Sequence, residues 1–600
     1  MKNIVRIFAI IDRPTKIGLS GVFVLMAVSA ALEIIGVGVF LPLLQILVDP
    51  GAIAALPLVG PALAEAAARD LRGFLIAVCG AALAIFILKS IVMAIVLLVQ
   101  NQFVLNKLAT FGRDLLHVYM DRPYTYHLQH NTAEMIRNIE LLPAGLFVKG
   151  VLPLLHIALE LMVGIGILGL LMTVNPQATL GAAALMGLSV VIFYRLIQKR
   201  VRHWGEIKVA YDGAILQWIQ QGLGSIKTTK LAGSQAFFAD AVEQRGLARA
   251  RVLSYLNTAP FLPRLFIEIA AVAALFVLVM TSLSASEGGV KSILPAIGLF
   301  GAAAVRLMPA LSKIVSSLTL LRERTATVDI LYDDLGGRPP RHSAGTSSPT
   351  TARFERELRL EGISFSYPGS QTLVLDNLTL TIRRGESIAL IGRSGAGKTT
   401  LADVVLGLLE PTKGRVLIDG LDVRQNLSSW QRRIGYVPQD IYLLDDTLRS
   451  NIALGLRGNE IDEAKLKRAV SLAHLDPVVA GLPQGLETVI GERGTRLSGG
   501  QRQRIGIARA LYNQPDVLIM DEATSALDGE TEREINEALA ELKAGLTVIV
   551  IAHRLTTVRS CDRLVLLDKG RVAATGTFAD LTEGNREFQR LAGLSLEAPA

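Results

Sequence analysis

The residues best suited to chemistry lie in a glycine-rich stretch at 392–399, with the sequence GRSGAGKT. Glycines let the backbone adopt conformations that a side chain would forbid, so consecutive N–H groups converge on phosphate oxygens. The lysine adds a point charge toward the β- and γ-phosphates, and the threonine hydroxyl is a ligand for Mg²⁺. A turn that only connects a strand to a helix is the alternative. The pattern favours a phosphate-binding loop made of Gly392, Ser394, Gly395, Gly397, Lys398 and Thr399.

The neighbouring segments predict how this loop is held. Residues 387–391 are an apolar run with strand composition, and residues 401–406 resemble the start of a buried helix. A strand, a glycine turn and a helix N-terminus together form the context in which this pattern binds phosphate. The helix would present its unpaired N–H groups and the positive end of its dipole to the same anion.

Four further features follow the loop along the chain. Gln439 lies at a predicted strand end, suited to touching Mg²⁺ or an attacking water, and LSGGQ occupies 497–501. A buried strand ends at Asp521 and Glu522, where the first carboxylate can bind Mg²⁺ and the second can polarise a water as a general base. Another buried strand, 547–552, ends at His553, which can sense the γ-phosphate by a hydrogen bond.

These motifs, taken in order, resemble the nucleotide-binding domain of ATP-binding cassette (ABC) transporters over residues 354–595. The resemblance implies ATP and Mg²⁺ as cofactors and assigns roles residue by residue. Tyr367 would stack on adenine, Thr400 would join Lys398 and Thr399 at the phosphates and Mg²⁺, and Asp528 would couple two ATP sites. The LSGGQ residues would complete the ATP site of the opposite subunit, and they are Ser498, Gly499, Gly500 and Gln501.

The resemblance also implies a homodimer, since a single cassette cannot close its own site. In this family the phosphate loop and LSGGQ of one site come from different subunits. One chain with one intact motif set therefore implies two competent sites per dimer. Glutamate at position 522 is part of that intact set.

The first half of the chain has the composition of a membrane domain. Six long apolar runs mark spanning helices, because about 20 apolar residues cross a bilayer. The two long connections are rich in Lys and Arg, whereas 173–176 and 284–289 contain neither. The positive-inside rule then places both chain ends and both long connections in the cytoplasm. The predicted spans are 17–48, 73–99, 143–172, 177–197, 255–283 and 290–321.

The expected fold is therefore a six-helix transmembrane exporter domain followed by an α/β P-loop nucleotide-binding domain with an antiparallel β subdomain. Its expected parts are residues 1–335, a flexible tether at 336–353 that is rich in Pro, Gly, Ser and Thr, and 354–600. Apolar residues at helical spacing predict that the long connections continue the membrane helices and turn back at 124–132 and 211–221. Residues 50–72 are expected to lie on the outer membrane surface.

Charges within the spans are costly, at about 2.5–3.5 kcal/mol each on insertion scales. Arg306 has no partner in its own helix, so it is expected to face a polar cavity and an anionic substrate group; snorkelling to the inner interface is the alternative. Arg264 either faces the same cavity or pairs with Glu268. The full set of such charges is Glu33, Lys89, Lys149, Glu160, Arg264, Glu268 and Arg306.

Short matches in the membrane half resemble the bacterial flippase of lipid-linked oligosaccharides. They lie around Glu33, at 225–227 with 232–233, at Pro263-Arg264 and at 305–309. This resemblance implies an ATP-driven flippase that moves a polyprenyl-pyrophosphate glycan from the cytoplasmic to the outer leaflet of the bacterial inner membrane. Basic cavity residues suit a pyrophosphate, which makes Arg264, Arg306 and Glu33 the candidate substrate residues.

Other functions remain open at this stage. A lipid A-like lipid, multidrug or peptide exporter would share the scaffold, and an ATP-gated channel or membrane regulator is the alternative of another class. The six spans exclude a soluble ATPase of the same cassette type. The net charge of +8 is spread over loops, so no nucleic-acid partner is expected. Cys79 and Cys561 lie in different halves and indicate neither a disulfide framework nor a metal site.

Overall fold

In the computed structural model the chain forms two compact units. The first contains residues 1–122 and 130–342, and the second contains 123–129 and 343–600. The structure describes residues 2–39, 70–285, 290–338, 354–491, 494–522, 545–552 and 555–592, with a few positions between 529 and 537. Most of the predicted surface segment at 50–72 and most of the predicted tether lie outside the described residues, and residues 71–72 begin α5.

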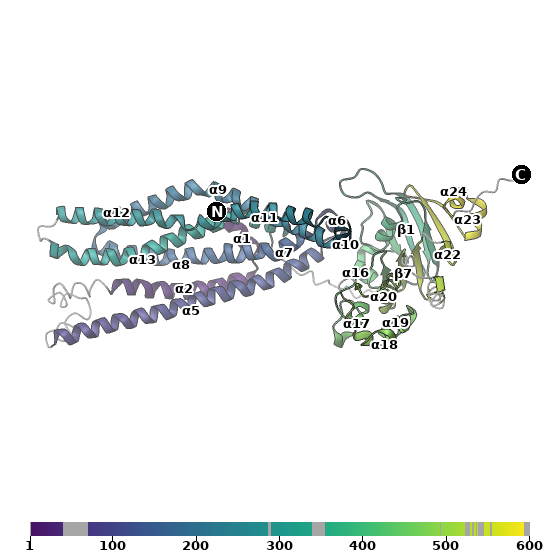
Figure 1. The fold of residues 1–600 in the computed structure, drawn as a ribbon, viewed down its shortest axis with the longest axis horizontal. Helices are drawn as coiled ribbons and strands as arrows, with labels where there is room; N and C mark the ends of the chain where they lie inside the picture. The colour runs from purple at the N-terminus through teal and green to yellow at the C-terminus, as the bar shows by residue number, and fades with distance from the viewer. Residues whose placement is uncertain are drawn as a thin grey trace. The chain divides into compact units, whose positions relative to one another are not determined.

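The first unit is entirely helical where it is described (Figure 1). A short helix, α1 (Lys2–Ile10), precedes α2 (Arg13–Gly38), and a π-helical turn, η2 (Phe147–Val151), joins α7 to α8. The other helices are α5 (Leu71–Met120), α7 (Thr132–Leu146), α8 (Leu152–Val174), α9 (Pro176–Gly224), α10 (Ile226–Leu231), α11 (Gln235–Thr258), α12 (Leu262–Ala285), α13 (Val290–Glu323) and α14 (Thr325–Asp334).

Six helical stretches among the described residues are long and apolar enough to cross a membrane, as the sequence predicts. Two of them are much longer than a crossing requires, since α5 has 50 residues and α9 has 49. At 1.5 Å per residue each is about 75 Å long, more than twice the roughly 30 Å hydrocarbon core. The prediction that membrane helices continue into the long connections is therefore confirmed.

The two turns at the ends of these helices differ in how well they were predicted. A short helix, α6 (Tyr124–Gln129), lies between α5 and α7, within the predicted turn at 124–132. The predicted turn at 211–221 is wrong, because α9 is helical throughout that range and the chain turns at α10. The apolar spacing at 215–223 instead packs α9 on α11, where the Trp218 ring contacts the rings of Phe237 and Phe238.

The second unit contains two sheets. The smaller is antiparallel with the order β2-β1-β4-β5, and its strands are β1 (Glu357–Phe365), β2 (Leu375–Arg383), β4 (Lys413–Ile418) and β5 (Leu421–Asp422). The larger has the order β10-β9-β3-β8-β7-β6 and is parallel from β9 to β6. Its strands are β3 (Ser387–Ile391), β6 (Ile434–Val437), β7 (Val517–Asp521), β8 (Thr547–Ile551), β9 (Arg563–Asp568) and β10 (Arg571–Gly576).

Short helices surround these sheets (Figure 1). They are α15 (Lys398–Val405), η3 (Val423–Asn426), α16 (Leu427–Gln431), α17 (Leu448–Ile452), η4 (Gly458–Glu460), α18 (Glu463–Leu472), α19 (Asp476–Gly481), η5 (Gly485–Glu487), α20 (Gly499–Tyr512), α22 (Leu555–Arg559), α23 (Phe578–Gly584) and α24 (Arg586–Leu591).

Strands β3, β7 and β8 are buried on both faces, which explains why they are continuous apolar runs. Successive residues point to opposite faces, so Ala389 and Ile391 of β3 enter one apolar cluster with α18 and α20. Ile388 and Leu390 enter the other cluster, with α15 and the small sheet. Because β3, β8, β7 and β6 are adjacent and parallel, the residues that follow them meet at one edge of the sheet.

Candidate nucleotide-binding site

The glycine-rich loop has the backbone that its sequence predicts. Gly395 and Gly397 have φ angles of 80° and 98°, a region in which side chains are strained, and Gly397 is the N-cap of α15. Gly392 has a φ of 150°, and a Cβ there would lie 2.3 Å from the Leu567 carbonyl oxygen of β9. The loop therefore requires glycine for backbone conformation and, at Gly392, for close packing on the neighbouring strand.

The Lys398 side chain hydrogen bonds to the backbone of the loop. Its ammonium donates hydrogen bonds to the carbonyl oxygens of Gly392 at 2.7 Å and Arg393 at 3.1 Å. Burial lowers the pKa of this amine, while the nearby Glu522 and Asp521 carboxylates oppose the effect. These residues fit a nucleotide phosphate, because the lysine charge lies inside a glycine loop at a helix N-terminus.

The two threonines after Lys398 face different surroundings. Thr399 is exposed, so its hydroxyl is accessible to a metal ion or phosphate. Thr400 is buried, and its hydroxyl is 3.1 Å from the Tyr367 hydroxyl in a hydrogen bond. The predicted adenine-stacking residue is thus tied to the helix that follows the phosphate loop.

Two of the residues predicted to act in hydrolysis, Gln439 and Glu522, come together at the same sheet edge. Gln439, two residues beyond β6, donates from its side-chain amide to the Glu522 carboxylate at 2.9 Å. Glu522 follows β7 directly and has a φ of 49°, which is uncommon for a residue with a side chain. Its amide donates to the Ile551 carbonyl of β8 at 3.1 Å, which holds the carboxylate at the end of the strand. His553 and Asp528 lie outside the described residues.

The LSGGQ segment begins a helix. Ser498 is the N-cap of α20, where its hydroxyl accepts a hydrogen bond from the Gln501 amide at 3.2 Å. The Gln501 side chain accepts in return from the Ser498 amide at 2.9 Å. This reciprocal capping box fixes the first turn, including Gly499 and Gly500, so that its N–H groups point outward from the helix start. That geometry suits a phosphate supplied from outside the chain.

One titratable residue next to this site was missed in the sequence. Asp403 lies in α15, and burial together with the Asp521 carboxylate raises the pKa of its carboxyl to about 6. The apolar surroundings of α15 offered a signal, since Asp403 is a charged position between residues that enter the core, Ala402 and Val404.

Six of the seven charged residues predicted in the membrane domain separate into two groups, and the seventh, Lys149, pairs with Glu323 at 3.5 Å. Arg306 of α13 lies 3.1 Å from Glu160 of α8 and 3.4 Å from Glu33 of α2, measured between nitrogen and carboxylate oxygen. Glu33 also accepts a hydrogen bond from Lys89 of α5 at 2.9 Å. Arg306 therefore has partners in other helices, although it has none in its own.

The second group lines a cavity of about 670 Å³ between α12 and α13. Arg264 and Glu268 both face this cavity, and within the described part of the chain no ion pair joins them. Lys313 was not predicted from the sequence, and its ammonium adds a second positive charge to the lining. The remaining lining residues are Pro260, Phe261, Val305, Met308, Pro309, Ser312 and Ser316.

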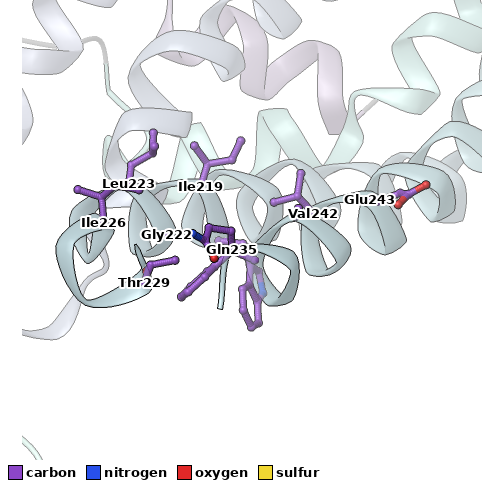
Figure 2. Close-up of a pocket in the computed structure, with 11 residues that line it drawn as sticks. Ile219, Gly222, Leu223, Ile226, Thr229, Gln235, Val242 and Glu243 are labelled. Atoms are coloured by element: carbon purple, nitrogen blue, oxygen red, sulfur yellow. The ribbon is translucent and has the colours of Figure 1, made fainter. Parts of the chain in front are cut away.

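A further cavity, of about 490 Å³, lies among α9, α10 and α11 and is almost entirely apolar (Figure 2). Leu223 and Ile226 lie toward one end of it and Glu243 toward the other (Figure 2). Leu223 is 67% exposed and Leu231, at the end of α10, is 82% exposed. The turn between α9 and α11 therefore presents an uncovered apolar surface.

Comparisons with known proteins agree with this arrangement. Residues 375–525 match the sequence model of the ABC transporter domain. The ATP-dependent lipid A-core flippase of Thiobacillus denitrificans is 34% identical over 438 residues, covering 72% of this chain and 73% of that protein. The heterocyst differentiation ATP-binding protein HepA of Nostoc is 46% identical over 231 residues, 38% of either chain. A bacterial Atm1-family ABC exporter solved with ATP bound has a TM-score of 0.82 at 23% identity, covering 98% of this chain and 100% of that one.

The fold and the site together define a P-loop ATPase joined to a six-helix membrane domain. With a relative of this identity and coverage, the chain belongs to the ABC transporter family. It is an exporter half-transporter, with one set of spans and one cassette, and an ATPase whose hydrolysis is coupled to transport.

Proposed function

We propose that this exporter flips a phosphorylated glycolipid from the cytoplasmic to the outer leaflet of a bacterial inner membrane. The observation that carries the proposal is the cavity between α12 and α13, which combines the Arg264 and Lys313 cations with apolar side chains such as Phe261 and Met308. Two cations suit a phosphate or pyrophosphate group, and the apolar lining suits the start of a lipid chain.

Two lipids share this chemistry. A polyprenyl-pyrophosphate glycan, that is a lipid-linked oligosaccharide, is the substrate that the motif resemblance implies. A lipid A-like molecule is supported by the relatives, because the Thiobacillus protein carries the name lipid A-core flippase. The two candidates differ in the number of acyl or prenyl chains and in the spacing of phosphates, so transport assays can separate them.

The ATP site supports a Mg²⁺–nucleotide complex. Thr399 and Asp521, with Gln439 beside them, would hold the metal, which supplies charge neutralisation at the phosphates. Lys398 would bind the phosphates, Glu522 would accept a proton from the attacking water, and Gln439 would orient the Glu522 carboxylate through their hydrogen bond. His553 and Asp528 keep the roles that the family resemblance implies.

A homodimer with cytoplasmic cassettes completes the proposal. The N-terminus of α20 faces outward, where it suits a phosphate of ATP bound to another chain, and the apolar surface around Leu223, Ile226 and Leu231 is uncovered. A second copy of the chain would supply the bound ATP and would cover the apolar surface. No nucleic acid is part of this proposal.

The test is reconstitution of the full-length protein in proteoliposomes with either phosphorylated glycolipid, a zwitterionic phospholipid or a cationic dye. We expect ATP-dependent movement of one glycolipid, and Arg264→Ala should raise the glycolipid concentration needed for half-maximal transport. Glu522→Gln should bind ATP normally and hydrolyse it about 10²–10⁴-fold more slowly, the usual contribution of a general base. Transport of the dye with neither glycolipid moved would instead indicate a multidrug exporter, and unchanged hydrolysis by Glu522→Gln would contradict its assignment as the base.

A further inference from the structure

The four charged residues of the first group form one connected network. The order is Lys89, Glu33, Arg306 and Glu160, so positive and negative charges alternate and the sum is zero. Their side chains are only 12–18% exposed. Each residue comes from a different helix, α5, α2, α13 and α8 respectively, so the network joins four spans.

Packing around the network is tight enough to fix its geometry. The Lys89 stem lies against α2, where a Cβ added at Gly36 would be 3.1 Å from the lysine Cδ atom. The lysine stem therefore packs closely on the backbone of α2 at Gly36. On α8, Gly166 leaves space for the Ile34 side chain, whose Cδ1 atom would be 2.0 Å from an added Cβ. Both close approaches hold α2 in place beside the charges.

Arg306 lies at the edge of the face of α13 that lines the cavity, about 100° around the helix from Val305 and about 20° from Lys313. Arg306 does not line the cavity, whereas Val305, Pro309, Ser312, Lys313 and Ser316 do, at helical spacings of 4, 3, 1 and 3 residues. Arg306 is thus directed toward α2 and α8, with both of its ion-pair partners on those helices. A rotation of α13 that released Arg306 would also turn Lys313 and Ser312 away from α12.

We propose that Lys89, Glu33, Arg306 and Glu160 form an ion-pair clasp that positions α13, and that Arg306 is a positioning residue and not a ligand of the transported anion. A partly buried cation whose charge is balanced by two carboxylates has little attraction left for a third anion, whereas Arg264 and Lys313 share the cavity with the single Glu268 carboxylate. The inference rests on the proposed function only in assigning the anion to the cavity cations. The clasp itself is independent of which lipid is moved.

The test compares a single and a double variant of the full-length protein. Arg306→Gln leaves Glu160 without its partner, and breaking a buried pair is strongly destabilising, so we expect a lower melting temperature and about tenfold slower transport. Arg306→Gln combined with Glu160→Gln removes both charges and keeps the Lys89–Glu33 pair. We expect this double variant to recover the melting temperature and most of the transport. Ser90→Ala, a neighbour of Lys89 whose hydroxyl bonds its own helix at the Phe86 carbonyl, is the matched control.

Two results would overturn the clasp. A double variant that melts normally but transports as poorly as Arg306→Gln would make Arg306 a ligand of the anion. An Arg306→Gln variant with the same melting temperature as the Ser90→Ala control would show that the network does not stabilise the packing of the helices. Should Arg306→Gln fail to fold, Arg306→Lys keeps the charge with fewer donors and is expected to melt below both the wild type and Ser90→Ala. Melting and basal ATP hydrolysis need no lipid, so they report on the clasp even if no glycolipid is transported.

Discussion

The substitution Gly392→Ala tests whether the phosphate loop is held by its packing on β9. An alanine Cβ at this position would lie 2.3 Å from the Leu567 carbonyl oxygen and 3.2 Å from the Ala396 Cβ. The nearer atom belongs to the backbone of a central strand, so the loop must move by about 1 Å to reach ordinary contact. Overpacking of this kind costs about 1–3 kcal/mol. The φ of 150° adds backbone strain of about 1–3 kcal/mol for a residue with a side chain.

Gly395→Ala is the matched control because it lies in the same loop at a φ of 80°, with nothing within 4 Å of an added Cβ. It carries backbone strain without the clash. If the clash and the backbone strain of Gly392→Ala both weaken nucleotide binding, the binding free energy falls by about 2–6 kcal/mol. This is a roughly 30-fold or greater loss of affinity at 1.4 kcal/mol per tenfold. Gly395→Ala should lose only the part due to strain.

The assay is binding of a fluorescent ATP analogue to full-length protein in detergent, with the melting temperature recorded in parallel. We expect Gly392→Ala to bind more weakly than Gly395→Ala by at least about fivefold, since the clash alone accounts for about 1–3 kcal/mol. Equal binding by the two variants would refute the argument, because it would mean that contact with Leu567 places no constraint on the loop.

Two other predictions concern the cassette. Because the folded pKa of Asp403 is about 6 against an ordinary 3.8, the folded state binds its proton more tightly, and the free energy of unfolding falls as pH rises from about 4 to 6. Asp403→Asn should reduce this fall in the free energy of unfolding by about 1–2 kcal/mol, which is less than the full pKa shift implies because the carboxyl is partly exposed. The measurement is chemical denaturation across this pH range, and identical pH profiles for the variant and the wild type would contradict the raised pKa of Asp403. Ser498→Ala should lose about 1 kcal/mol of capping and slow ATP hydrolysis, whereas Thr577→Ala, which removes the equivalent cap of α23, should lose similar stability with normal hydrolysis. Equal hydrolysis rates in the two variants would show that the Ser498 cap contributes to stability and not to ATP hydrolysis.

Much of the cassette could be predicted from the sequence because its chemistry is local. The phosphate loop, Glu522 and Ser498 each directly follow a strand or begin a helix, so a short motif specifies both the residues and their setting. Gln439 and Glu522 are far apart in the chain, yet both follow parallel strands of one sheet, and the sheet order brings them within a hydrogen bond. Motif order predicted the fold, and parallel strand pairing then determined the site.

The membrane domain was predicted less completely because contacts between helices depend on rotation and depth, which local patterns do not specify. Arg306 has no partner in its own helix, and only the packing of α8 and α2 against α13 brings Glu160 and Glu33 to it. The turn at α10 was missed because the apolar spacing before it was interpreted as a docking segment. Gly224 and Ser225, which end α9, were the better signal.

The length of α9 has a mechanical consequence. A rod of 49 residues is about 74 Å long, so a pivot of only about 5° about one end carries the other through about 6 Å. A small tilt of α9 within the membrane therefore moves the α10 turn by more than the length of a side chain. A displacement of the α10 turn in turn tilts the part of α9 that lies in the bilayer. A continuous helix of this length transmits the tilt from one end to the other, whereas a flexible connection of the same length would not.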